Sequence, residues 1–279
     1  MSRTALAALF LGAALVAPTL ASADSSLTAA GSTALLPLVK ASAEAYQDKH
    51  PDVKISVTGG GSRVGITQVA AKAVDLGDSD ILAKGYPDLV DHRVAVIGFS
   101  VLTHPGINVK NVTKRQLQDI FAGKITNWKE VGGADVKIVI INRPRSSGTR
   151  AVFTQTIMGN TPVNESGLTE DATGTVITAV RTTPGAVSYA AFSGTKRFEN
   201  GRYETVEGIS ELAIDGVAPT EENVENGKYP IWSYEHIYTN GVASKDASRF
   251  LAFISSNSAI IHQLGYILTR DMKVSESDR

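Results

Sequence analysis

The chain has 279 residues with a formal net charge of −1, and it contains no cysteine. The lack of cysteine excludes disulfide bonds, zinc–thiolate sites and thiol catalysis. The near-neutral balance of 27 basic and 28 acidic residues argues against nucleic acid as a partner, whereas a single local anion site needs no positive net charge.

The first 23 residues have the layout of a secretory signal peptide. Arg3 precedes an apolar run over residues 5–20, and residues 21–23 read Ala-Ser-Ala, which is typical of a cleavage site. The run is shorter than the roughly 20 residues of a spanning helix, so a membrane anchor is the less favoured interpretation. We expect cleavage after Ala23 and export to the periplasm. No cysteine is present to carry a lipid, so we do not expect a lipoprotein.

After this leader, helix and strand patterns alternate. An apolar helical face begins near Leu35, and Pro37 falls in its first turn, where proline is tolerated. Apolar residues then alternate with polar ones over 53–57, which predicts a strand. The further elements predicted in this part are a helix over 64–73, a short strand over 74–77 and a buried strand over 93–103.

The alternation restarts after residue 110. Thr113 is a suitable N-cap for a helix that ends at Gly123. Strands that alternate with helices predict an α/β fold, and two similar blocks predict two lobes. The predicted elements are strands over 137–141, 186–191 and 231–238, helices over 150–158, 176–180 and 246–264, and a loop over 223–230.

Three loops rich in glycine and hydroxyl groups each lie between a predicted strand and a predicted helix. They are residues 30–34 (Ala-Gly-Ser-Thr-Ala), 59–62 (Gly-Gly-Gly-Ser) and 143–149 (Arg-Pro-Arg-Ser-Ser-Gly-Thr). A helix N-terminus carries partial positive charge and unpaired N–H groups, so it attracts anions. Taken singly, each loop is better explained as an ordinary helix cap or turn. The three together indicate an anion site at the carboxyl ends of strands, where ligands of α/β folds bind.

Arg143 and Asp80 are the charged candidates for this site. A guanidinium has paired donors that match an oxyanion, although most arginines form surface ion pairs. A carboxylate suits an anion that keeps a proton, as phosphate does near neutral pH, because it accepts the P–O–H hydrogen and repels sulfate. Asp80 as a helix cap is the alternative. A calcium loop of Asp75, Asp78 and Asp80 is disfavoured because it lacks the required glycine and distal glutamate.

Several motifs, spread over nearly the whole chain after residue 23, are together specific to one protein family, although each alone is weak evidence. They are residues 31–33, 59–62, 79–80, 120–128 (Ile-Phe-Ala-Gly-Lys-Ile-Thr-Asn-Trp), Arg143 with 147–149, and 215–220 with 227–230. The chain thereby resembles the periplasmic phosphate-binding proteins, which are the substrate receptors of phosphate ABC transporters.

The resemblance implies a type II periplasmic-binding-protein fold, with two lobes, a hinge and a ligand cleft between the lobes. We expect lobe I to span residues 24–100 and 231–279, and lobe II to span residues 101–230.

Two departures from the family are an acid at Asp78 and a charge at Arg63, which we expect to compensate each other. In addition, Ala34 is smaller than its counterpart in some relatives. The phosphate contacts implied are Ser32, Thr33, Ala34 (through its backbone), Ser62, Asp80, Arg143, Ser147, Gly148 and Thr149.

The predicted function is capture of inorganic phosphate and its delivery to an ABC permease in the inner membrane. We expect a monomer that uses no cofactor and no metal and is not an enzyme. A receptor for another tetrahedral oxyanion, such as sulfate or molybdate, is the alternative, and a secreted phosphatase is a weaker one. The sequence has no G-x-S-x-G elbow, no tight metal-ligand motif and no nucleotide-binding glycine motif.

Overall fold

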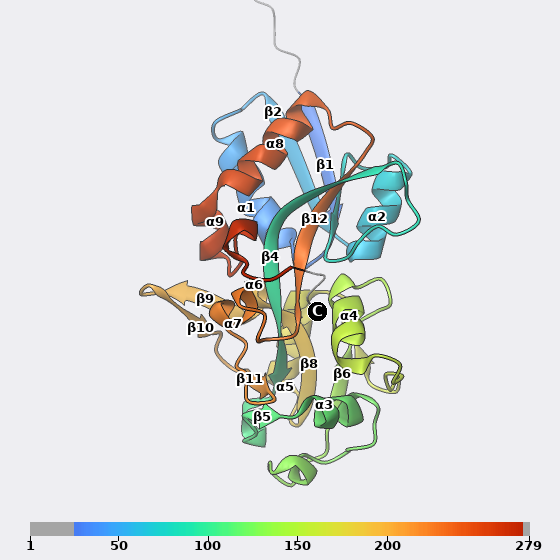
Figure 1. Ribbon diagram of the computed structural model, residues 1–279, viewed down its shortest axis with the longest axis vertical. Coiled ribbons are helices and arrows are strands. Elements are labelled where there is room, and N and C mark those ends of the chain that lie inside the picture. The colour runs from blue at the N-terminus through green and yellow to red at the C-terminus, as the bar shows by residue number, and fades with distance from the viewer. Residues whose placement is uncertain (1–24, 276–279) are drawn as a thin grey trace, which may run out of the picture.

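The computed structural model describes residues 25–275 and has a mixed α/β fold built on one long, curved sheet (Figure 1). The strand order is β2-β1-β3-β12-β4-β8-β6-β7, with β11 beside β4 and β5 beside β11. The predicted fold class is confirmed.

One end of the sheet carries the first and last elements of the chain, and the other end carries the middle. Figure 1 shows β1, β2 and α2 at one end and β5 and β11 at the other, with β4 running between them. The first group comprises β1 (Ser25–Gly31), α1 (Leu36–Gln47), β2 (Val53–Gly59), α2 (Ser62–Ala70), β3 (Leu76–Ser79), β12 (Trp232–Asn240), α8 (Lys245–Ser256) and α9 (Ser258–Gln263). The second comprises β5 (Asn111–Val112), α3 (Lys114–Phe121), β6 (Val139–Asn142), α4 (Gly148–Phe153), β7 (Leu168–Thr169), α5 (Thr173–Thr182), β8 (Ala186–Ala191) and β11 (Ser210–Ile214).

Strand β4 (Leu89–Thr103) belongs to both groups and changes its main partner part-way along. Residues 89–98 pair antiparallel with β12, whereas residues 99–103 pair with β8. The chain crosses a second time just before β12, where the Phe99 amide donates to the Ile231 carbonyl at 2.9 Å. The chain thus crosses between the two groups at two adjacent places, and a hinge that lets one group move relative to the other would lie there. The smaller elements near this region are α6 (Phe192–Thr195), β9 (Lys196–Glu199), β10 (Arg202–Thr205) and α7 (Glu221–Glu225).

The three glycine- and hydroxyl-rich loops lie where they were predicted, each after a strand and before a helix. They connect β1 to α1, β2 to α2 and β6 to α4. Because β1 pairs parallel with both β2 and β3, the carboxyl ends of these strands meet at one edge of the sheet. Thr113 caps α3 as predicted, with its side chain accepting from the Gln116 amide at 3.1 Å.

Several element bounds differ from the prediction. The helix expected over residues 246–264 is two helices, because Asn257 leaves the helical conformation and caps α9 by accepting from the Ile260 amide at 3.3 Å. The loop expected over 223–230 contains part of α7, which Thr220 caps. The strand predicted from residue 74 begins at Leu76, and the strand predicted from residue 93 begins at Leu89.

Among the described residues, no helix has both the length and the apolar character to cross a membrane. The predicted signal peptide lies outside the described residues. One cluster of buried apolar residues draws on both ends of the sheet and includes Trp128, which is fully buried and donates its Nε1 to the Gly185 carbonyl at 2.9 Å.

Candidate functional site

The loops from the two ends of the sheet meet and touch each other. The Arg63 amide, in the first turn of α2, donates to the Ser146 carbonyl at 3.1 Å. Gly61 has φ of +93° beside this contact, and a Cβ there would lie 2.8 Å from the Ser146 carbonyl oxygen. Only glycine allows this conformation and this approach of the two backbones.

Asp80 is the polar centre where these loops converge. It follows β3 and is only 3 % exposed. The Ser32 hydroxyl donates to Asp80 Oδ1, and the Thr149 hydroxyl donates to Asp80 Oδ2 at 2.9 Å. The Asp80 amide donates to Ser62 Oγ at 2.9 Å. One carboxylate is therefore held by hydroxyl groups from the β1–α1 loop and from α4, at opposite ends of the sheet.

The ionisation of Asp80 is balanced between burial and these donors. Burial raises the pKa of Asp80 above its ordinary value. The hydroxyl groups of Ser32 and Thr149, and then the charge of Arg143, oppose that rise because they stabilise the carboxylate. The arrangement suits a group that accepts hydrogen bonds from a ligand.

Arg143 supplies the positive charge of the cluster. It is 1 % exposed, and its Nη2 donates to Thr33 Oγ1 at 3.2 Å and to the Asp171 carbonyl at 3.0 Å. Its Nε and Nη1 are buried and have no hydrogen-bond partner among the described residues. Burial lowers the pKa of Arg143, and the nearby Asp80 carboxylate opposes this shift. Arginine remains protonated in proteins, so the guanidinium presents two buried, charged donors that an anion would satisfy.

The remaining predicted residues line the same junction. Ser32 Oγ accepts from the Ala34 amide at 3.0 Å, and Ser147 Oγ caps α4 by accepting from the Arg150 amide at 3.2 Å. Ser147 is therefore a helix cap as well, whereas Ser32 closes a turn before α1, whose N-cap residue is Leu35. Gly148 lies so close to the opposite loop that a Cβ would be 2.7 Å from Ser62 Cβ. All nine predicted residues thus belong to one cluster: Ser32, Thr33, Ala34, Ser62, Asp80, Arg143, Ser147, Gly148 and Thr149.

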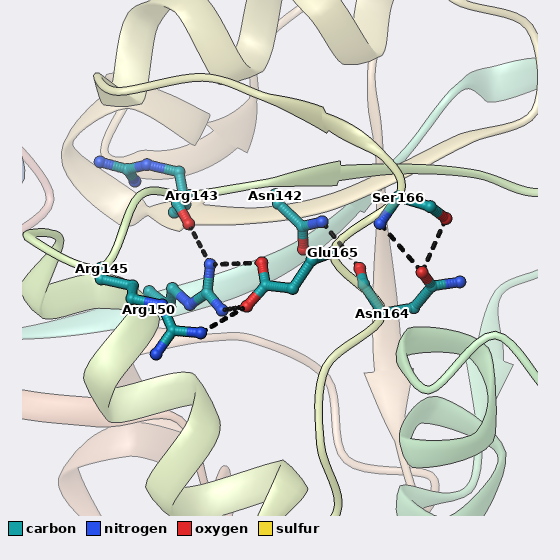
Figure 2. Close-up of polar contacts among 7 residues, drawn as sticks. All are labelled: Asn142, Arg143, Arg145, Arg150, Asn164, Glu165 and Ser166. Carbon is teal, nitrogen blue, oxygen red and sulfur yellow. Dashed lines mark hydrogen bonds and ion pairs between the residues drawn. The ribbon is translucent and has the colours of Figure 1, made fainter.

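Two residues that support the Arg143 loop were not predicted (Figure 2). Arg150 Nη1 donates to the Arg143 carbonyl at 2.6 Å, and Arg150 Nη2 pairs with Glu165 Oε1 at 2.6 Å. Arg145 reaches the same carboxylate at 3.4 Å from a side chain that is 87 % exposed. In Figure 2 the Arg150 guanidinium lies between the Arg143 carbonyl and Glu165, so it fixes the backbone that carries Arg143. The only sequence signal for this role is that Arg150 directly follows the Ser-Gly-Thr motif.

The expected compensation between Asp78 and Arg63 is wrong. Asp78 is fully buried on β3, and neither of its carboxylate oxygens has a hydrogen-bond partner among the described residues. Arg63 is exposed, and its Nε donates to the Arg145 carbonyl at 3.0 Å. Burial raises the pKa of Asp78 well above its ordinary value, and repulsion from Asp80 adds to the rise. Burial and the nearby Asp80 therefore favour the protonated form of Asp78, and no pairing with Arg63 compensates its charge.

A cleft of about 530 Å³ opens beside the cluster, between α2 and α4. Asp80 lines it together with Arg63, Gln155 and Ser233. Within the described part of the chain, no three histidine or acidic side chains are grouped so that they could hold a metal ion. Asp75, part of the disfavoured calcium loop, instead accepts from the Thr28 amide and hydroxyl at 2.8 Å each.

Comparisons with known proteins agree with this geometry. The family model described as a PBP superfamily domain matches residues 16–258. The phosphate-binding protein PstS of Bacillus subtilis is 44 % identical over 261 residues, which cover 91 % of this chain and 84 % of that protein. PstS of Borreliella burgdorferi is 27 % identical over 85 % of this chain and 88 % of that protein.

Solved structures of phosphate-transport proteins also resemble this chain over most of its length. A Clostridium perfringens protein described as a phosphate ABC transporter substrate-binding protein, crystallised with bound phosphate, has a TM-score of 0.80 and 29 % identity, covering 88 % of this chain and 99 % of that one. An ABC-type phosphate transport receptor of Vibrio cholerae has a TM-score of 0.69 and 27 % identity, covering 86 % and 99 %. The chain therefore belongs to the PBP superfamily and, within it, to the PstS family of phosphate-binding proteins.

Proposed function

We propose that this protein is an exported receptor that binds inorganic phosphate between its two lobes and delivers it to a phosphate ABC transporter. One observation carries the proposal: Asp80, Thr149 and Arg143 converge from opposite ends of the sheet into one buried cluster. That cluster offers unpaired guanidinium donors beside a carboxylate acceptor. The four similar proteins compared above bear names or titles that identify them as phosphate-binding or phosphate-transport proteins.

The pairing of a cation with an acceptor fits the chemistry of phosphate. The oxygens of phosphate accept from the guanidinium of Arg143 and from the loop donors at Ser32, Thr33, Ala34, Ser62 and the Ser147–Thr149 turn. The remaining P–O–H group donates to Asp80. Sulfate lacks that proton near neutral pH, so its lone pairs would face the carboxylate and be repelled.

Binding is coupled to lobe closure in this proposal. Lobe I comprises residues 24–100 and 231–279, and lobe II comprises residues 101–230. The hinge lies close to these bounds, near residues 98–100, where β4 changes partner, and near Ile231, where the chain returns. Ligand shifts the open–closed equilibrium because only the closed form makes contacts from both lobes.

We also propose that the protein acts as a monomer outside the inner membrane, after cleavage at Ala23, and that its closed form is the one read by the permease. It binds phosphate without chemical turnover. The cluster holds a cation, an acceptor and hydroxyl groups, and its serines Ser32, Ser62 and Ser147 form hydrogen bonds with the Asp80 carboxylate or with backbone amides.

The direct test is titration calorimetry of the secreted form with phosphate, sulfate and arsenate. We expect phosphate to bind at least about a hundredfold more tightly than sulfate, since like-charge juxtaposition costs several kcal/mol. Tighter binding of sulfate than of phosphate would favour the alternative oxyanion, and release of phosphate from an ester would favour an enzyme.

Closure has its own test. Trp232 begins β12 at the hinge, whereas Trp128 is buried in the other half of the molecule. A Trp128→Phe variant therefore leaves Trp232 as the single tryptophan reporter. We expect phosphate to change its emission and to reduce the radius of gyration in small-angle scattering; no change in either, at saturating phosphate, would refute closure.

A further inference from the structure

Glu235 lies directly beside Asp80, on the neighbouring strand. The antiparallel β3–β12 pair joins Asp78 to Ile237 and Ser79 to His236. Continuing that register by one residue places Glu235 opposite Asp80, so the two side chains occupy the same face of the sheet. Glu235 is fully buried at this position, where the register of β12 with β4 also shifts.

Within residues 25–275, no group donates a hydrogen bond to the Glu235 carboxyl. Both of its oxygens are buried and without a hydrogen-bond partner among the described residues. The register makes the Asp80 carboxylate the acceptor to which a proton on Glu235 can be donated. Two facing carboxyl groups need a shared proton, because two buried carboxylates in contact repel strongly.

The surroundings decide which carboxyl holds that proton. Asp80 accepts from the Ser32 and Thr149 hydroxyls and lies near the charge of Arg143, all of which stabilise its ionised form. Glu235 has none of these partners. Burial raises the pKa of Glu235 well above its ordinary value, with the charges of Asp80 and then Asp78 adding to the rise.

We propose that Glu235 is a positioning residue that determines anion specificity: as a neutral acid it donates a hydrogen bond to Asp80 and so keeps Asp80 an acceptor toward the ligand. The proposal rests on the proposed phosphate function. Asp80 then acts only as an acceptor: it accepts one hydrogen bond from Glu235 and another from the phosphate P–O–H. The other titratable or charged groups that act on this pair are Asp78, Arg143 and Tyr266.

Two substitutions of Glu235 should behave in opposite ways. Glu235→Leu removes the donor, so Asp80 gains a proton more easily and can itself donate to a fully deprotonated oxyanion. We expect the ratio of phosphate to sulfate affinity to fall by about tenfold or more, the size of a hydrogen bond to a charged group. Glu235→Gln keeps a neutral donor, because its NH₂ group replaces the acid O–H, and should restore the ratio to within about threefold of the wild type.

The pH dependence gives a second readout that a merely structural residue would not change. As pH rises through the raised pKa of Glu235, the wild type gains a second negative charge beside Asp80 and loses phosphate affinity. Glu235→Gln cannot ionise, so the ratio of its affinity to that of the wild type should increase with pH; taking this ratio cancels the titration of phosphate itself. Glu221→Leu is the control, since Glu221 also has a raised pKa from burial but lies in α7 near Lys196.

The experiment is calorimetric titration of the wild type, Glu235→Leu, Glu235→Gln and Glu221→Leu with phosphate and sulfate from pH 6 to pH 9, with thermal melts to confirm folding. If Glu235→Leu leaves the phosphate-to-sulfate ratio unchanged, or Glu235→Gln loses as much discrimination as Glu235→Leu, the inference is overturned. If Glu235→Leu does not fold, the pH trend of Glu235→Gln alone decides. Failure of the wild type to bind phosphate would instead refute the proposed function.

Discussion

Gly148 gives the sharpest test of whether the two loops close on each other around the ligand. It is the first residue of α4 and faces Ser62 and Asp80 across the junction. A Cβ at this position would lie 2.7 Å from Ser62 Cβ and 2.9 Å from Asp80 Cβ, and neither atom can move without its backbone. Alanine is otherwise well tolerated here, because it favours helices by up to about 1 kcal/mol over glycine.

The expected cost of Gly148→Ala follows from these distances. Carbon atoms in contact sit about 3.5 Å apart, so the loops would have to separate by roughly 0.8 Å. The Thr149–Asp80 hydrogen bond of 2.9 Å would lengthen beyond its normal range, and Arg143 would move away from Thr33. Losing two hydrogen bonds to charged groups costs about 3–6 kcal/mol, which is a roughly 10²- to 10⁴-fold weaker affinity for phosphate.

Titration calorimetry of Gly148→Ala measures this loss, and thermal melting measures the fold. We expect phosphate affinity to fall by this factor while the variant still melts cooperatively as a folded protein. Gly174→Ala is the matched control, because Gly174 also lies in the first turn of a helix but no atom lies within 4 Å of its added Cβ. Binding by Gly148→Ala within about threefold of the Gly174→Ala affinity would show that the loops are not in contact in the bound state.

Three further predictions follow from the same cluster. Asp80→Asn should weaken phosphate more than sulfate, because an amide both donates and accepts; equal losses for the two anions in calorimetry would contradict the role of Asp80. Arg143→Ala should weaken phosphate binding by roughly 2–5 kcal/mol, the usual cost of truncating one partner of a buried charge pair. Arg145→Ala is the control, because the Arg145 side chain is exposed and its loss should change binding little. Similar losses in both variants would mean that net positive charge, rather than direct contact by Arg143, supports binding. Asp78→Asn should flatten the decline of melting temperature with pH. Because the folded pKa of Asp78 is raised above 3.8, burying this side chain does not destabilise the fold at low pH, and it destabilises the fold increasingly as pH rises toward that folded pKa. Melting temperatures of variant and wild type that change in parallel with pH would refute this.

The candidate site was largely predictable because its chemistry is local. Glycine, serine and threonine between a strand and a helix indicate a turn with exposed amides whatever the rest of the chain does. The loops at residues 30–34, 59–62 and 143–149 therefore lie where their sequences indicated. The convergence of Asp80, Arg143 and Thr149 was inferred from the family resemblance, and the structure brings these residues together.

What the sequence did not reveal depends on long-range strand pairing. Glu235 approaches Asp80 only because β12 returns from the far end of the chain and inserts beside β3. No periodicity links the two positions. Glu165 was likewise missed, since it lies in a loop that becomes relevant only when Arg150 reaches it. The pairing expected between Asp78 and Arg63 was wrong because β3 turns Asp78 into the core while Arg63 stays at the surface.

The central place of β12 in the sheet has a consequence for how the chain folds. Residues 232–240 fill the gap between β3 and β4, so the sheet of the first lobe cannot be completed until nearly the whole chain is available. Until then, β3 and the first half of β4 present unpaired backbone edges, which are prone to aggregation. The middle of the chain faces no such delay, since β4, β6, β8 and β11 pair among themselves. We therefore expect refolding to show a fast phase for the middle segment and a slower one, set by strand insertion, for the first lobe.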